Sequence, residues 1–194
     1  MTGKIYNNSI WIIFLLAGLL FVAFENKQGP EIPLSKVEKE ARRILKFSSV
    51  SIHPLSDNVL KAEQTVWYSL IHEGKKTGFV AVSRVESCRA GGCDAGFGLD
   101  QQPFEYFDYF VIFSSEGEVL KVNVFNYQAT RGHEIMSHGW LRQFKGANAN
   151  KTLVVGREIQ AISGATISVN AITADIVLKT SCLSKYLADS LVLQ

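Results

Sequence analysis

The chain has 194 residues, of which 47% are hydrophobic, and its formal net charge at pH 7 is +2. A hydrophobic content of this size is enough to build a core, which excludes a disordered protein. The basic residues are not gathered into a block, so the charged surface expected of a nucleic-acid-binding protein is missing. We therefore expect one folded domain with an appended segment, and no nucleic acid partner.

The appended segment is SIWIIFLLAGLLFVAF, from Ser9 to Phe24, which contains no charged residue. Such a run predicts a membrane-directed helix outside the fold. Lys4 precedes it and acidic residues follow, so the positive-inside tendency places the domain beyond the inner membrane, facing the periplasm or cell exterior. Residues 1–33 are thus predicted to be an anchor with a linker, or a cleaved signal segment of a secreted protein, and residues 34–194 to be the domain.

In chain order, the first predicted element of the domain is an amphipathic helix over SKVEKEARRILKF, from Ser35 to Phe47. Ser35 and Glu38 have the spacing of a capping box at its start. The apolar residues that share one face of this helix are Val37, Ala41, Ile44 and Leu45.

Two β-hairpins follow, because residues 65–85 and 105–128 are rich in β-branched and aromatic residues on both sides of a short turn. The predicted turns are 73–76 and 115–117. The glycine-rich residues 88–98 between the hairpins predict a loop.

After the second hairpin we expect a short helix at 134–138 and another turn at 140–144, then a strand over KTLVVGREIQAI, residues 151–162. A long helix then begins at Thr166. Its apolar face carries Ile172, Ile176, Leu183 and Leu187. This order of elements predicts an α+β domain with a mostly antiparallel sheet and packed helices, preceded by the membrane helix.

The start of the last helix carries Ser163, Gly164, Ala165 and Thr166. A helix amino terminus exposes unpaired N–H groups and the positive end of the dipole, so it stabilises a phosphate without a lysine. Gly164 permits a close backbone approach, and the two hydroxyls could bind a phosphate or be esterified by one. The alternative is that Ser163 or Thr166 is an ordinary N-cap residue.

The sequence ISGAT before a carboxy-terminal helix, in a chain with an amino-terminal membrane segment, resembles the extracytoplasmic FMN-binding domain family. That family includes flavin-carrying components of the sodium-pumping NADH:quinone reductase and of the Rnf electron-transfer complex. Its last motif threonine carries FMN through a phosphoester bond installed by a flavin transferase. The resemblance implies FMN as cofactor, Thr166 as covalent acceptor with Ser163, Gly164 and Ala165 as its turn, and residues 34–194 as the FMN-binding domain.

Other segments resemble the family in order and spacing. GKKTGFVAV, from Gly74 to Val82, is similar to its early hairpin, and GEVLKVNVFNYQATRG is similar to the strand that enters a Thr-x-Gly loop beside the flavin. This implies that Thr130, Gly132 and Glu134 lie near the ring. WLRQF, residues 140–144, matches a following Trp/Phe segment. Gln160 departs from the family, whose transferase commonly recognises an aspartate there, and residues 86–110 have no counterpart that we can match.

The resemblance implies a membrane-anchored electron-relay flavoprotein, not a stand-alone enzyme, whose partners are the flavin transferase and redox proteins such as a membrane electron-transfer complex. The chain lacks G-x-G-x-x-G and CxxC motifs, so NADH oxidation and iron–sulfur relay would belong to those partners. The alternative is a membrane-anchored partner-binding module with noncovalent flavin or none. An aromatic cluster could then contact a partner or stack on a flavin ring, or it could belong to the core. Its members are Tyr106, Phe107, Tyr109 and Phe110.

A hydrolase that uses Ser163 or Thr166 with His133 or His138 is disfavoured, because alanines replace the glycines of a nucleophile elbow.

The three cysteines are Cys88, Cys93 and Cys182. In an oxidising compartment Cys88 and Cys93 could form a disulfide, which could exchange electrons with a flavin, or they could be free thiols. Their spacing disfavours a zinc site.

Overall fold

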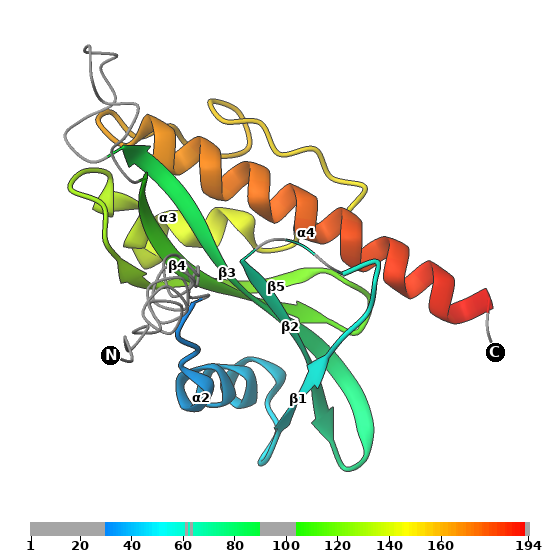
Figure 1. The fold of residues 1–194 in the computed structure, drawn as a ribbon. Coiled ribbons are helices and arrows are strands. Elements are labelled where there is room, and N and C mark those ends of the chain that lie inside the picture. The colour runs from blue at the N-terminus through cyan, green and yellow to red at the C-terminus, as the bar shows by residue number, and fades with distance from the viewer. Residues whose placement is uncertain (1–29, 61, 63, 90–103, 193–194) are drawn as a thin grey trace, which may run out of the picture.

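The computed structural model describes residues 30–60, 62, 64–89 and 104–192 (Figure 1). The predicted membrane segment, Cys93 and most of the predicted glycine-rich loop lie outside these residues. Among the helices that the structure does describe, none combines the length and the apolar character needed to cross a membrane.

The domain is built on a five-stranded sheet in which the strands follow one another in space as they do in the chain. They are β1 (Ser51–Leu55), β2 (Thr65–His72), β3 (Lys75–Arg89), β4 (Phe104–Ser114) and β5 (Val119–Tyr127). Every neighbouring pair is antiparallel, which confirms the predicted α+β class and the antiparallel sheet.

Both predicted hairpins are present. Glu73 and Gly74 join β2 to β3 with positive φ values of 49° and 76°, the conformation that a two-residue hairpin turn favours. Gly117, with φ of 84°, lies in the turn between β4 and β5. A Cβ at this glycine would lie 3.2 Å from the side chain of Leu187, so the turn packs closely on the last helix.

Each face of the sheet is covered by different helices (Figure 1). The long helix α4 (Thr166–Val192) covers one face together with the short elements η2 (His133–Met136), α3 (His138–Leu141) and η3 (Arg142–Phe144). The helix α2 (Leu34–Leu45) covers the other face. Strand β4 therefore contributes Phe107, Tyr109, Val111 and Phe113 to the α4 side, and Phe110 and Ile112 to the α2 side. The core interpretation is thus confirmed for three members of the aromatic cluster, and Tyr106 lies half-buried under Arg84.

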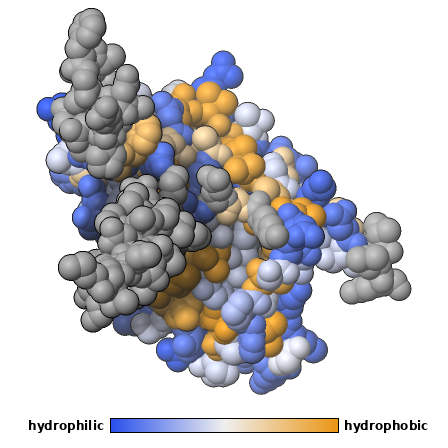
Figure 2. All heavy atoms as spheres, viewed as in Figure 1, coloured by the Kyte–Doolittle hydropathy of each residue, from blue (hydrophilic) through white to orange (hydrophobic). Residues whose placement is uncertain are grey.

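The predicted helix from Thr166 is confirmed, with Ile172, Ile176 and Leu183 fully buried. Burial of each such side chain contributes about 1.5–3 kcal/mol. Under this helix the buried hydroxyl of Tyr109 donates to Asp175 over 2.6 Å, and Lys179 donates to the same carboxylate. Ile167, Val177 and Leu178 are exposed, and Figure 2 shows hydrophobic residues among hydrophilic ones along this outer surface.

The predicted capping box at Ser35 is wrong. The helix α2 begins at Leu34, and the carbonyl of Pro33 accepts the first bonds from the N–H groups of Lys36 and Val37. Proline before the first turn needs no N–H partner and holds φ near the helical value. The Oε1 atom of Glu38 instead lies 3.7 Å from Nε of Arg42, one turn along the helix.

The predicted strand over residues 151–162 is also wrong. Gly156 has φ of 89°, its N–H donates to the carbonyl of Ile159, and the chain turns back on itself there. The Glu158 carboxylate accepts a bond from the N–H of Val154, a donor that a strand would have paired with a neighbour. Leu153 and Ile159 are nevertheless buried in the core below α4, which explains the apolar pattern.

Candidate functional site

The motif residues form a tight turn that leads directly into α4. The N–H of Ala165 donates to the carbonyl of Ile162 over 3.1 Å, and Gly164 in this turn has φ of 83°. The carbonyl of Ala165 accepts the first helical bond, from Val169 over 2.9 Å. Ala165 therefore holds the N-cap position, and Thr166 is the first helical residue.

The interpretation of Ser163 or Thr166 as an N-cap is therefore wrong, because Ala165 has no hydroxyl and the two motif hydroxyls make no hydrogen bond to a described residue. Both side chains are exposed. No described side chain caps the N–H groups of the first turn of α4, which together with the helix dipole favour an anion. A Cβ at Gly164 would meet nothing within 4 Å, so the space beside the turn is open.

Thr130 lies on the loop after β5, where Glu105 of β4 holds it. The backbone N–H of Thr130 donates to one carboxylate oxygen over 2.9 Å, and its hydroxyl donates to the other over 2.7 Å. Glu105 itself is only 9% exposed. The carboxylate thus fixes the loop, and the Thr130 hydroxyl has already used its one proton.

Gly132, on the same loop, packs against the first turn of α4. It is buried with φ of 88°, and a Cβ there would lie 2.7 Å from Ser168 Oγ and 2.8 Å from the hydroxyl of Tyr127. Only glycine fits this position. The structure therefore brings the predicted Thr-x-Gly loop beside the helix that begins at Thr166. Glu134 is exposed in η2, which follows the loop directly.

A chain of hydroxyl groups joins the loop, the sheet and the helix. The Tyr127 hydroxyl donates to the Arg131 carbonyl over 2.6 Å and lies 2.9 Å from Ser168 Oγ. Ser168 Oγ lies 2.8 Å from Ser87 Oγ on β3. Sequence reasoning missed Ser87, Tyr127 and Ser168 as members of the site.

Tyr127 is held by packing as well as by hydrogen bonds. Its ring stacks on Phe107 with centroids 5.5 Å apart and planes 11° from parallel. Burial raises the pKa of Tyr127, hydrogen bonding with Ser168 and Ser87 opposes that shift, and the charges of Glu134 and Glu105 add to it. Tyr127 therefore stays protonated at neutral pH.

The segment before the motif is fixed by backbone bonds at Gln160, the position where the sequence departs from the family. The indole N–H of Trp140 donates to the Gln160 carbonyl over 2.8 Å, and the Gln160 N–H donates to Gln143 over 2.7 Å. The residue is exposed.

The structure describes some of the residues named in the disfavoured alternatives, a hydrolase and a zinc site. Neither Ser163 nor Thr166 has a histidine partner there, and His133 and His138 are exposed. In the same part of the chain, no three His, Cys, Asp or Glu side chains are placed to hold a metal ion. Cys182 is a half-buried free thiol, whereas the side chains of the predicted Cys88–Cys93 pair lie outside the described residues.

Comparison with protein families gives a match over residues 107–176 to the FMN-binding domain. Over this stretch the chain is similar to the FMN-binding domain family. The matched stretch includes Tyr127, the loop from Thr130 to Gly132 and the start of α4, which are the parts that meet at the site. The match supports FMN as the cofactor. A comparison with curated proteins found no match.

Proposed function

We propose that this protein is an electron-relay flavoprotein that carries FMN covalently, by a phosphoester bond to Thr166. The observation that carries the proposal is the position of Thr166, the first residue of α4, whose exposed hydroxyl makes no hydrogen bond to any residue that the structure describes. A residue that served only as an N-cap would have its hydroxyl bonded to the helix.

The residues around Thr166 fit a phosphate. The uncapped N–H groups of the first turn are donors for its oxygens, and the positive end of a helix of 27 residues favours its charge. Gly164 leaves the approach open, and Ser163 offers a second hydroxyl. When the transferase forms the ester from a phosphoanhydride of FMN, the Thr166 oxygen bonds to phosphorus, the anhydride P–O bond breaks, and the leaving phosphate takes up the hydroxyl proton. The chain therefore gains the mass of FMN less one water.

FMN bound through its phosphate would supply one- and two-electron redox chemistry from its ring. The chain's own contribution is to hold the loop of Thr130 and Gly132 against α4, through Glu105 and Tyr127. We propose that this arrangement orients the FMN at the start of α4, and that the chain's role is positioning and not acid or base catalysis.

We further propose that residues 1–33 anchor the domain at the inner membrane with the domain facing outward. The apolar run from Ser9 to Phe24 supports this part. Outside the cytoplasm a dissociated FMN would be diluted away, so a covalent bond keeps the carrier loaded. The partners are a flavin transferase and redox proteins on either side of the relay.

The test is flavin fluorescence of the full chain after co-expression with a flavin transferase and separation under denaturing conditions. We expect a fluorescent band for the native chain and for Ser163→Ala, and none for Thr166→Ala. Loss of flavin from the native chain on denaturation would contradict the covalent bond. Repeated cycles of flavin reduction by dithionite and reoxidation by a soluble quinone, with no other product, test the relay.

Gln160 favours the second candidate, a partner-binding module with noncovalent flavin or none, since an exposed glutamine stands where a transferase would meet an aspartate. Gln160→Asp separates the two. If this variant becomes fluorescent while the native chain does not, the native chain is the binding module.

A further inference from the structure

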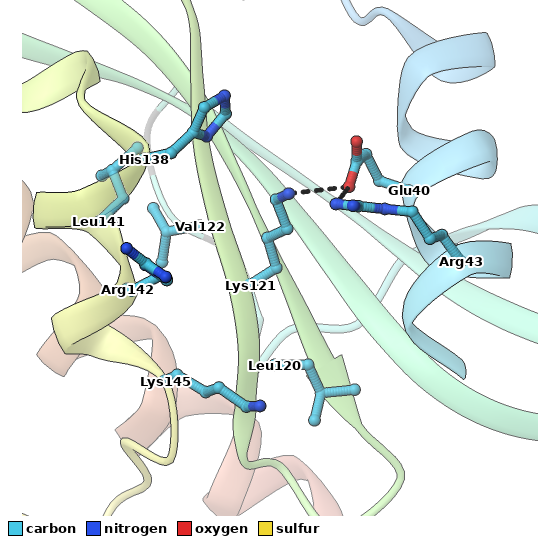
Figure 3. Close-up of a pocket in the computed structure, with 9 residues that line it drawn as sticks. All are labelled: Glu40, Arg43, Leu120, Lys121, Val122, His138, Leu141, Arg142 and Lys145. Carbon is cyan, nitrogen blue, oxygen red and sulfur yellow. Dashed lines mark hydrogen bonds and ion pairs between the residues drawn. The ribbon is translucent and has the colours of Figure 1, made fainter. Parts of the chain in front are cut away.

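A pocket of about 620 Å³ lies at the β5 edge of the sheet, between α2 and the α3–η3 segment (Figure 3). This volume suits a small organic ligand. Its walls come from three elements far apart in the chain, with α2 on one side of β5 and α3 on the other. The lining residues are Glu40, Arg43, Leu120, Lys121, Val122, His138, Leu141, Arg142 and Lys145. None of them belongs to the motif at α4 or to the loop of Thr130 and Gly132.

The pocket is strongly cationic. Two lysines and two arginines line it, opposed by the single carboxylate of Glu40. Lys121 and Arg43 both donate to one oxygen of that carboxylate, over 2.8 Å and 2.7 Å. Burial alone would raise the pKa of Glu40, but these two hydrogen bonds outweigh it and lower the pKa. The carboxylate thus stays charged and offsets part of the positive charge on the α2 side of the pocket.

On the opposite wall, the described residues include no such partner. Arg142 and Lys145 form no ion pair with any residue in the described part of the chain, and His138 stands beside them without a carboxylate. Both charged side chains are exposed and can move toward a ligand. A ligand that balances this lining needs more than one negative charge.

We propose that this pocket binds a phosphorylated organic anion, with its phosphate at Arg142 and Lys145 and its carbon skeleton over Leu120, Val122 and Leu141. A phosphate carries the required charge in one compact group, and the guanidinium of Arg142 can bind two of its oxygens at once. The apolar side chains in the lining favour a ligand with a carbon skeleton over a simple inorganic ion, because covering them removes apolar surface from water. The phosphate could belong to a soluble metabolite or to a phospholipid headgroup.

The test is calorimetric titration of the full, FMN-loaded chain with phenyl phosphate and with inorganic phosphate. We expect phenyl phosphate to bind more tightly, and Arg142→Gln/Lys145→Gln to weaken it about tenfold or more. The matched control is Lys151→Gln/Arg157→Gln, which removes the same charge from exposed positions outside the pocket. Equal affinities of the pocket and control variants, or no preference for phenyl phosphate over inorganic phosphate, would overturn the proposal.

A second variant guards against trivial loss of folding. Glu40→Gln removes the only acidic charge in the pocket and frees Lys121 and Arg43, so we expect phenyl phosphate to bind several-fold more tightly. Misfolding cannot produce such a gain, and an unchanged or weaker affinity counts against the proposal.

Vesicles distinguish the two sources. Binding to phosphatidylcholine vesicles only when they contain phosphatidic acid, lost in the pocket variant and kept in the control, assigns the phosphate to a lipid headgroup. If neither phenyl phosphate nor these vesicles bind, the pocket is not a phosphate site.

Discussion

The hydroxyl of Tyr127 lies 2.9 Å from Ser168 Oγ, which joins the end of β5 to the first turn of α4 across 41 positions of sequence. The same tyrosine donates to the carbonyl of Arg131, so one side chain holds both the loop and the helix. Because Thr166 is two residues before Ser168, the position of the proposed FMN acceptor depends on this bond.

Tyr127→Phe tests that dependence. The change keeps the stacking on Phe107 and removes the hydroxyl, so we expect the free energy of unfolding to fall by about 1–2 kcal/mol. Urea titration measures the loss. The control is Tyr186→Phe, which removes only a 3.4 Å bond from Lys76 and should cost about 0.5 kcal/mol or less. Equal losses in the two variants would show that the hydroxyl network adds nothing.

Gly132→Ala tests the close approach of the loop to α4. Its φ of 88° and the contacts at 2.7 Å and 2.8 Å with Ser168 and Tyr127 combine backbone strain with a clash. The matched control is Gly156→Ala, where φ is 89° but nothing lies within 4 Å of the new methyl. We expect the strain alone to cost about 1–2 kcal/mol in the control, and the clash to add about 1–3 kcal/mol at Gly132. Thermal unfolding measures the loss of stability in both variants. Similar losses would mean that the loop shifts away from α4 at no cost in free energy.

Glu105→Ala tests the clamp on Thr130. Both hydrogen bonds to the carboxylate are lost, but the exposed Thr130 can be rehydrated, so we expect a loss near the low end for charged hydrogen bonds, about 1.5 kcal/mol. The more specific result is faster amide hydrogen exchange at Thr130. Glu105→Gln should restore most of the protection, because its amide oxygen still accepts from the Thr130 N–H. If the Glu105 carboxylate does not hold the loop, amide hydrogen exchange at Thr130 will be unchanged in both variants.

The buried Tyr109 predicts a loss of stability in alkali. Burial raises its pKa well above the ordinary value, and the charge of Asp175 and the hydrogen bond to it raise the pKa further. Above a pH of about 10 the unfolded chain releases this proton while the folded chain keeps it, so the free energy of unfolding falls as pH rises. Below that pH the contribution is complete. Urea titrations on both sides of it should show a shallower decline for Tyr109→Phe, and identical declines would contradict the assignment.

The parts of the fold that could be predicted from sequence are those with a local signal. The two hairpins have glycine turns between β-branched runs, and α4 has its helical period and the motif at its start. Strand β1 was missed because it is a short edge strand that contains Pro54, a residue that usually argues against a strand. The wrong strand at 151–162 has the apolar content of a strand, but its turn at Gly156 depends on Glu158, which binds the backbone of Val154.

The residues of the candidate site likewise fall into two groups, those with a local sequence signal and those without one. The motif at Thr166 and the glycine at 132 could be singled out from sequence because both stand in short patterns that resemble the FMN-binding family. Ser87, Tyr127 and Ser168 could not, since Ser87 and Ser168 are 81 positions apart and a lone hydroxyl gives no sign of its partner. Glu105 was missed for the same reason, because only the pairing of β4 with β5 brings it near Thr130.

The most direct test of the proposed function is the intact mass of the full chain after co-expression with a flavin transferase, measured beside Thr166→Ala and Ser163→Ala. We predict that the native chain and Ser163→Ala gain the mass of FMN less one water, and that Thr166→Ala does not. A native chain with no added mass, or a Thr166→Ala chain that keeps the addition, would contradict the assignment of Thr166 as the residue that carries FMN.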